Sequence, residues 1–179
     1  MNVSNRKVHK FIGLVVSVQL LLWTISGIFF SFNKIDQIRG ENYLKSVEQV
    51  TPKKISRISF DEAKELVIEK TYLKPISVEE ITEEKRGSEF RGRNLPLYKL
   101  SSLDSSDKEV NVYIDPSLGK IVAIRTFEWR LWDLMWGLHI MDWRDRDDIN
   151  NLFLKIFSIL ALISSVTGII LFFRPKSKA

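Results

Sequence analysis

Two long apolar runs frame the chain, and charged residues fill the segment between them. The first run covers residues 11–32 without a formal charge, and the second covers residues 152–173 with Lys155 near its start. Each has about 22 residues, enough for an α-helix to cross ~30 Å of hydrocarbon. A cleaved signal peptide is a poorer interpretation of the first run, because it is too long and no small-x-small site follows it. The pattern therefore predicts two transmembrane helices.

Basic residues lie beside both runs, close to the two ends of the chain. They are Arg6, Lys7, Lys10, Arg174, Lys176 and Lys178. Because Lys and Arg mark the cytoplasmic flank of a membrane helix, we expect both termini in the cytoplasm and residues 34–150 outside it. The net charge of +5 is explained by these flanks. Since no basic stripe is interleaved with aromatic residues, we expect a lipid-bilayer partner and no nucleic-acid partner.

The polar middle of the chain predicts one small α+β domain. Ser59 and Glu62 have the spacing of a capping box, and the residues that follow place one apolar face on a helix. Strand patterns then follow at 76–81, 97–100, 110–114 and 121–124, with a turn at 115–119. The charged residues 83–94 predict a solvated loop. The expected fold class is a membrane protein in which two transmembrane helices flank a helix and an antiparallel sheet.

These patterns give the domain boundaries. Residues 1–33 form the N-terminus and first transmembrane helix, and residues 34–55 an irregular linker. Residues 56–127 form the extracytoplasmic domain, and 128–151 a Trp-rich interfacial segment with a turn. The second transmembrane helix covers 152–174, and 175–179 form a cytoplasmic tail.

Four of the five tryptophans lie between residues 128 and 143. They are Trp129, Trp132, Trp136 and Trp143, spaced close to a single helical face. Indole rings favour the membrane–water boundary, so this spacing predicts an interfacial helix. The mixed-charge residues 144–148 predict a solvated turn, with a divalent-metal site as the alternative.

Small residues in the two apolar runs predict helix packing. Gly13, Gly27 and Gly168 lie within them, and antiparallel helices would place Gly13 and Gly168 at the same depth, where they are expected to meet. Gln19 is polar at mid-membrane and is expected to hydrogen-bond to another helix. Because two helices bury little surface, we expect a homodimer or another membrane subunit.

The residue types present exclude several chemistries. The chain has no cysteine, which excludes disulfides, thiolate metal sites and cysteine nucleophiles. The central domain has no histidine, and acidic residues such as Asp61, Glu79 and Glu80 are expected at its surface. We identify no catalytic residues, and a binding or regulatory module is expected in preference to an enzyme acting alone.

The two histidines, His9 and His139, are the candidate metal ligands. An imidazole nitrogen can ligate haem iron; the alternatives are a basic flanking residue for His9 and an interfacial aromatic residue for His139. A helix that crosses the bilayer separates the two rings by ~25–30 Å, so they cannot ligate one haem from opposite sides. If each binds haem, a second chain must supply the other ligand.

The order of several short motifs resembles the PepSY-associated transmembrane family. The motifs are Arg-x-x-His-x-x-x-Gly at 6–13, a small-Gly element at 23–27, Leu-His at 138–139, and Thr-Gly with an aromatic-Arg exit at 167–174. The helix from Phe60 and the strands at 112–120 resemble one PepSY domain.

This resemblance implies a bacterial inner-membrane protein linked to iron acquisition. It also implies haem b held by His9 and His139, with Trp132, Trp136 and Trp143 shielding the outer site. Larger members include siderophore-linked reductases with more helices and histidines. Many also have a small residue where this chain has Ile140 and Met141. Independent reductase activity is therefore not expected.

Soluble PepSY domains imply a different function, the regulation of proteases. The alternative is therefore a cofactor-free membrane-tethered module that binds an exported peptidase or envelope protein.

Overall fold

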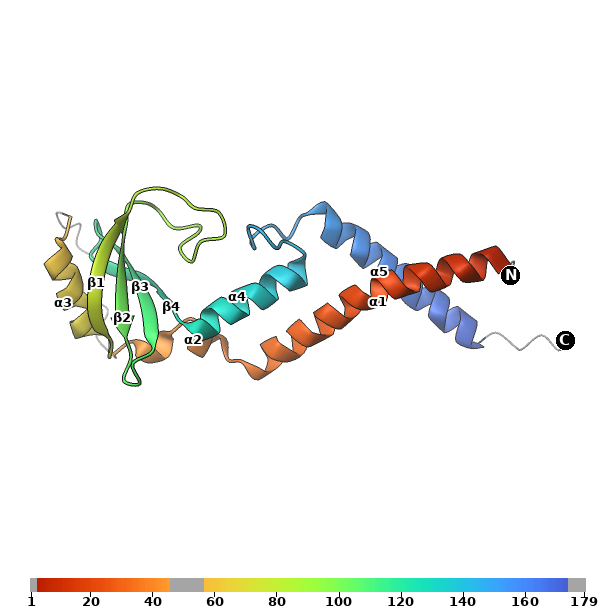
Figure 1. The fold of residues 1–179 in the computed structure, drawn as a ribbon, viewed down its shortest axis with the longest axis horizontal. Helices are drawn as coiled ribbons and strands as arrows, with labels where there is room; N and C mark the ends of the chain where they lie inside the picture. Colours follow the sequence, from red (N-terminus) through yellow and green to blue (C-terminus); the bar gives the residue numbers. More distant parts are fainter. Residues whose placement is uncertain (1–2, 46–56, 174–179) are drawn as a thin grey trace. The chain divides into compact units, whose positions relative to one another are not determined.

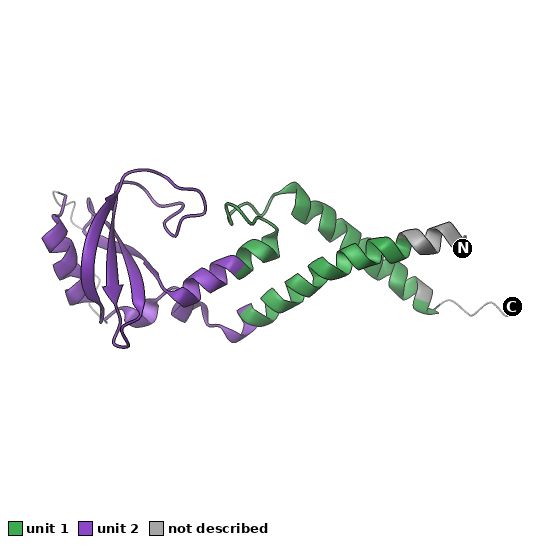
Figure 2. Ribbon diagram, viewed as in Figure 1, with its two compact units in different colours: residues 1–29, 135–179 green, residues 30–134 purple. Residues whose placement is uncertain are grey.

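The computed structural model describes residues 3–45 and 57–173, with side chains from His9 onward except Leu171. Three parts of the prediction lie outside this description. They are the side chains of the basic residues Arg6 and Lys7, the linker residues 46–55, and the basic residues Arg174, Lys176 and Lys178. The chain divides into two compact units, residues 30–134 and residues 1–29 with 135–179 (Figure 2).

Residues 30–134 form the predicted α+β domain (Figure 1). Its elements are α2 (Ile35–Ile38), η1 (Glu41–Tyr43), α3 (Phe60–Lys70), β1 (Lys74–Ile81), β2 (Leu97–Leu103), β3 (Glu109–Asp115), β4 (Lys120–Arg125) and the start of α4 (Phe127–Ile140). The strands form an antiparallel sheet in the order β1-β2-β3-β4. The predicted helix and all four predicted strands are confirmed.

Helix α3 begins where its capping box predicts. The backbone N–H of Glu62 donates to Ser59 Oγ, and the Glu62 carboxylate accepts from the Ser59 backbone N–H at 2.6 Å. Ala63 and Val67 are fully buried against one face of the sheet. That face contributes the remaining buried side chains of the main core, which are Tyr98, Leu100, Val110, Val112, Ile114 and Ile124.

The opposite face of the sheet is covered by the segment that joins β1 to β2. Phe90 and Leu95 pack against Leu97, Tyr113 and Ala123. The predicted loop at 83–94 is confirmed, with residues 83–86 and 92–94 exposed, but residues 87–91 at its centre are partly buried. The burial of Phe90 was not predicted, because charged residues flank it and its partners lie on strands that follow later in the sequence.

Residues 34–45 also differ from the predicted irregular linker. They contain α2 and η1, and Ile38 is buried at 3% exposure. Gly40 has φ +74°, and a Cβ there would lie 2.7 Å from Ile124 Cγ2. The backbone reaches the sheet this closely because glycine has no side chain and tolerates the left-handed conformation.

Residues 1–29 and 135–179 contain α1 (Val3–Phe32, which ends in the other unit), the end of α4, and α5 (Leu152–Phe173). The segments 9–32 and 152–170 are apolar and have 24 and 19 residues. At a rise of ~1.5 Å per residue they extend for about 36 and 28 Å, enough to cross a bilayer. The two predicted apolar helices are thus confirmed, and most of their side chains are exposed.

The predicted glycine contact between the two spans is not formed. A Cβ added at Gly13, Gly27 or Gly168 would meet no heavy atom within 4 Å in the described chain. Three polar residues, Gln19, Ser26 and Thr167, instead make hydrogen bonds between helices. The physical reason is that unsatisfied polar groups are costly away from water, whereas small residues permit close packing without requiring it.

Candidate functional site

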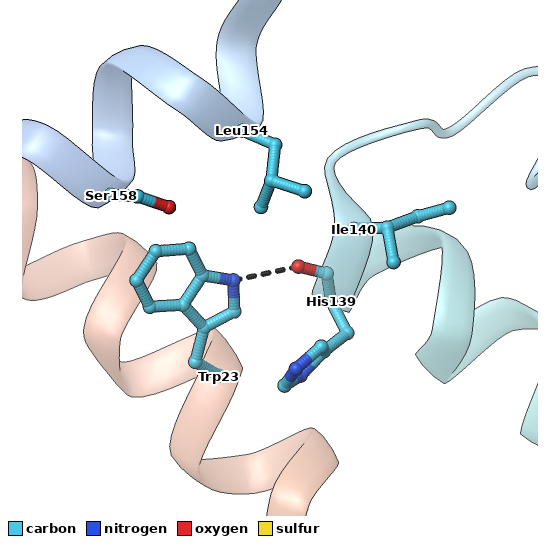
Figure 3. Close-up of a pocket in the computed structure, with 5 residues that line it drawn as sticks. All are labelled: Trp23, His139, Ile140, Leu154 and Ser158. Carbon is cyan, nitrogen blue, oxygen red and sulfur yellow. Dashed lines mark hydrogen bonds between the residues drawn. The ribbon is translucent and has the colours of Figure 1, made fainter. Parts of the chain in front are cut away.

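His139 lies in the last turn of α4, where three side chains hold it. Its Nδ1 is 2.7 Å from Ser26 Oγ of α1. Trp23 Nε1 donates to the His139 backbone carbonyl at 2.7 Å (Figure 3). The Trp136 ring is stacked on the imidazole, with centroids 6.4 Å apart and planes inclined by 11°. The ring is therefore fixed on two sides by residues of two helices.

The hydroxyl beside His139 has two partners. Ser26 Oγ lies 2.8 Å from the backbone carbonyl of Leu22 and 2.7 Å from His139 Nδ1. When the hydroxyl donates to the carbonyl, its oxygen accepts from Nδ1–H, and the lone pair of the neutral ring is then on Nε2. Burial lowers the pKa of His139, which favours this neutral form. A neutral imidazole with an acceptor at Nδ1 is the usual form of a metal-binding histidine.

His9, at the other end of α1, has the same arrangement. Its Nδ1 lies 3.3 Å from Thr167 Oγ1 of α5. The Thr167 hydroxyl also lies 2.7 Å from the Ile163 carbonyl oxygen, and when it donates there its own oxygen accepts from Nδ1–H of His9. Both histidines are consequently held at Nδ1 by a hydroxyl of a neighbouring helix.

The two imidazoles lie far apart along α1. His9 is on α1 itself, whereas His139 bonds to Ser26, about 25 Å further along at ~1.5 Å per residue. This agrees with the expected separation and excludes one haem with both rings as axial ligands. Among the described residues, no three His, Cys, Asp or Glu side chains are grouped to hold a metal ion.

A pocket of about 340 Å³ adjoins His139. It is lined by Trp23, His139, Ile140, Leu154 and Ser158, which come from α1, α4 and α5 (Figure 3). Small-molecule sites of this kind are mostly apolar with a few placed polar groups. Its volume lies at the lower end of the ~300–1,000 Å³ typical of such sites.

The end of α4 has a donor for every terminal carbonyl. The carbonyls of residues 137–140 accept, in order, from Asp142 N (3.0 Å), Gln19 Nε2 (3.5 Å), Trp23 Nε1 (2.7 Å) and Asn151 Nδ2 (2.8 Å). Met141 has φ +57°, the left-handed residue that ends a helix in a Schellman motif. The bond from Gln19 confirms the hydrogen bond expected for that residue.

The four tryptophans of the predicted interfacial helix do not share one environment. Trp129 is buried in the α+β domain at 8% exposure, and Trp132 contacts Phe30 with centroids 5.4 Å apart. Trp136 stacks on His139, whereas Trp143 is 60% exposed. The prediction that all four tryptophans share one helical face is wrong for Trp143, because α4 ends at Ile140.

The acidic residues after α4 form a backbone-capping loop. The Asp142 carboxylate accepts backbone N–H bonds from Asp145, Asp147 and Asp148 at 3.0–3.1 Å. Burial opposes ionisation, but these bonds hold the pKa of Asp142 below its usual value. The Asp142 oxygens are therefore occupied by backbone N–H groups of the loop. This geometry does not favour the alternative metal site at 144–148.

A partly buried ionic network on the sheet was not predicted from the sequence. Arg130 Nε donates to Glu89 Oε1 at 2.5 Å, while Asn111 Nδ2 and Tyr113 Oη donate to Glu89 Oε2 at 2.8 and 3.0 Å. Burial alone would raise the pKa of Glu89, but these bonds hold it below its usual value. The one available signal was Asn111 and Tyr113, polar groups two residues apart and hence on one face of a strand.

Comparison with known proteins gives one match. The family described as the PepSY-associated TM region matches residues 6–179. No curated protein and no solved structure matches the chain.

Proposed function

Because the chain belongs to the PepSY-associated TM family, we propose that this membrane protein binds haem b and assists electron transfer across the bacterial inner membrane in iron acquisition. His9 and His139 are the proposed axial ligands. The supporting observation is that each imidazole is held at Nδ1 by a hydroxyl of a neighbouring helix. A hydrogen bond at one ring nitrogen is what orients a histidine that ligates a metal through the other. When bound, haem b supplies reversible one-electron chemistry at its iron.

The chain supplies one imidazole at each end of α1, so each site needs a second axial ligand. A second copy of this chain, with the same residues at the same depth, is the proposed source. The open faces at Gly13, Gly27 and Gly168 support this arrangement, because a Cβ built at each would meet no heavy atom of the described chain within 4 Å. Trp136 would shield the His139 site from water through its stacked ring. Trp132 and Trp143 are also proposed to shield it, as the resemblance implies.

We place both termini in the cytoplasm and residues 34–150 outside it, on the basis of the flanking basic residues. In that orientation His9 serves the cytoplasmic side and His139 the outer side. The protein then acts as one component of a reductase system, because the chain has no catalytic group of its own in this proposal.

Visible absorbance tests the proposal. The protein is purified from cells supplied with haem precursor, and the ratio of Soret to protein absorbance is measured for wild type, His9→Ala and His139→Ala. With one haem at each level, each variant retains about half the wild-type ratio, while the double variant retains none. Thr24→Ala is the matched control, since this exposed α1 hydroxyl bonds only within its own helix. Colourless wild-type protein, or an unchanged ratio in both variants, would overturn the proposal.

A specific feature of the α+β domain favours a second function, binding of an exported protein. β1 is an edge strand of the sheet, and large apolar side chains near it are exposed. They are Ile68 (55%), Tyr72 (66%) and Ile76 (61%). An edge strand beside apolar groups can receive an extended segment of a partner. A photocrosslinking residue at position 76 would then capture one defined envelope protein, whereas the same residue at exposed Leu118 would not.

A further inference from the structure

The pocket of about 340 Å³ beside His139 lies at a depth that selects the phase from which a ligand comes. Trp23 lies nine residues before the end of α1 at Phe32, and Ser158 lies six residues after the start of α5 at Leu152. At ~1.5 Å per residue these positions are about 14 and 9 Å inside the two apolar spans. A ligand of this pocket therefore has to be soluble in hydrocarbon.

The walls of the pocket are mainly apolar. Ile140 and Leu154 line it together with the Trp23 indole, whose N–H is already engaged by the His139 carbonyl at 2.7 Å. Indole and aliphatic surfaces of this kind pack well against a flat ring. All the lining residues belong to the unit formed by residues 1–29 and 135–179.

Ser158 supplies a polar group that the chain itself does not use. Within the described residues its hydroxyl makes no hydrogen bond, whereas the hydroxyls of Ser17, Thr24 and Thr167 each lie within 2.8 Å of the carbonyl four residues earlier in their helices. In Figure 3 the Ser158 oxygen points from α5 into the space between Trp23 and Leu154. A hydroxyl without a partner in hydrocarbon is costly, so a ligand that pairs with it gains affinity.

We propose that this pocket binds the head group of a lipid-soluble quinone. The planar ring packs against the Trp23 indole, and a ring carbonyl accepts from the Ser158 hydroxyl. The same hydroxyl oxygen accepts from the O–H group of the reduced ring, so one side chain serves both forms of the ligand. The isoprenoid tail stays in the hydrocarbon on the side of Ser158, which is exposed. A lipid acyl chain is the competing occupant, but it offers no polar group to Ser158.

This inference rests on the pocket and not on the proposed haem, so the two are tested separately. The full chain is purified from cells without added haem precursor, and the absence of a Soret band is verified. It is then placed in phosphatidylcholine nanodiscs and illuminated with a short-tailed azido-ubiquinone as the photoreactive probe. We expect saturable labelling of residues that line the pocket, and displacement of the probe by unlabelled decylubiquinone.

The Ser158→Ala variant removes the hydrogen bond and keeps the pocket. The probe concentration for half-maximal labelling should rise by roughly three- to tenfold, the effect of one neutral hydrogen bond. The control is Ser165→Ala, which removes an exposed hydroxyl of α5 outside the pocket and should cause no shift. In a second variant, Leu154→Trp, a larger side chain fills the space beside the intact hydroxyl, and labelling should be lost.

Three results would overturn the proposal. The first is labelling that decylubiquinone does not displace, and the second is equal half-maximal concentrations for Ser158→Ala and Ser165→Ala. The third is displacement of the probe by oleic acid as effectively as by decylubiquinone, which would identify the pocket as an acyl-chain site.

Discussion

Ser26 Oγ and His139 Nδ1 lie 2.7 Å apart, and this contact joins α1 to the last turn of α4. Ser26 is 1% exposed, so no solvent replaces its hydroxyl if it is removed. The contact therefore fixes the packing of the two helices and the orientation of the imidazole.

Replacement of Ser26 by alanine should destabilise the helix packing. Nδ1 of the partly buried His139 ring would lose its hydrogen-bond partner, at a cost of about 1 kcal/mol. Thermal unfolding in detergent should show a lower midpoint than for Thr24→Ala, whose hydroxyl bonds to Leu20 within α1. Equal midpoints for the two variants would contradict the proposed role of Ser26.

Replacement of Trp23 by phenylalanine tests the hydrogen bond of the indole N–H separately from the packing of the aromatic ring. Phenylalanine keeps most of the aromatic surface but has no N–H for the His139 carbonyl, which Trp23 now reaches at 2.7 Å. We expect a loss of about 1–2 kcal/mol in the free energy of unfolding. Trp143→Phe provides the control because Trp143 is 60% exposed, and it should change stability little. A similar loss in both variants would argue against the hydrogen bond.

Glu89 should make the stability of the α+β domain depend on pH. Its pKa is lower in the folded chain than in the unfolded chain, so its ionised form favours folding. That contribution is complete above the ordinary carboxylate pKa, near 4.5, and is lost as the pH falls through the lower folded value. Glu89→Gln should therefore be less stable at pH 7 and show a smaller decline between roughly pH 5 and 3.

Thermal unfolding followed by near-ultraviolet circular dichroism measures this dependence. Glu84→Gln, an exposed change in the same segment, should keep the wild-type pH profile. If Glu89→Gln declines as steeply as wild type, another carboxylate is responsible.

Replacement of Gly40 and of Gly92 by alanine distinguishes a steric clash from backbone strain. Both have positive φ, +74° and +72°, but only at Gly40 would a Cβ meet Ile124, at 2.7–2.9 Å. Gly92→Ala should therefore cost about 1 kcal/mol, from the left-handed backbone alone. Gly40→Ala should cost about 1–3 kcal/mol more, because the buried Ile124 has to move. Equal stability of the two variants, measured by thermal unfolding, would show that residues 34–45 do not pack on the sheet.

The sequence was sufficient where structure depends on neighbouring residues. The capping box at Ser59 and Glu62, and the alternating strand around Val112, are short-range patterns, and both elements form as predicted. The two apolar runs are equally local, because hydrocarbon thickness alone determines the length of a span.

Prediction from sequence failed where a residue depends on a distant partner. Glu89 looks like a surface carboxylate until Arg130 and Tyr113 are brought beside it by the fold. The end of α4 was missed because Met141 adopts positive φ, a conformation that is usual for glycine and rare for methionine. For the candidate site, both histidines were identified from sequence, but Ser26 and Thr167 were not identified as their hydrogen-bond partners.

The four satisfied carbonyls at the end of α4 have a consequence for insertion into the membrane. A helix terminus that enters hydrocarbon normally carries bare carbonyl oxygens, each costing several kcal/mol. Here α1 provides two of the four donors, from Gln19 and Trp23, and Asn151 at the start of α5 provides another. The carbonyls at the end of α4 are therefore satisfied only after α1 and α5 are in place. We infer that α4 packs against these two helices last.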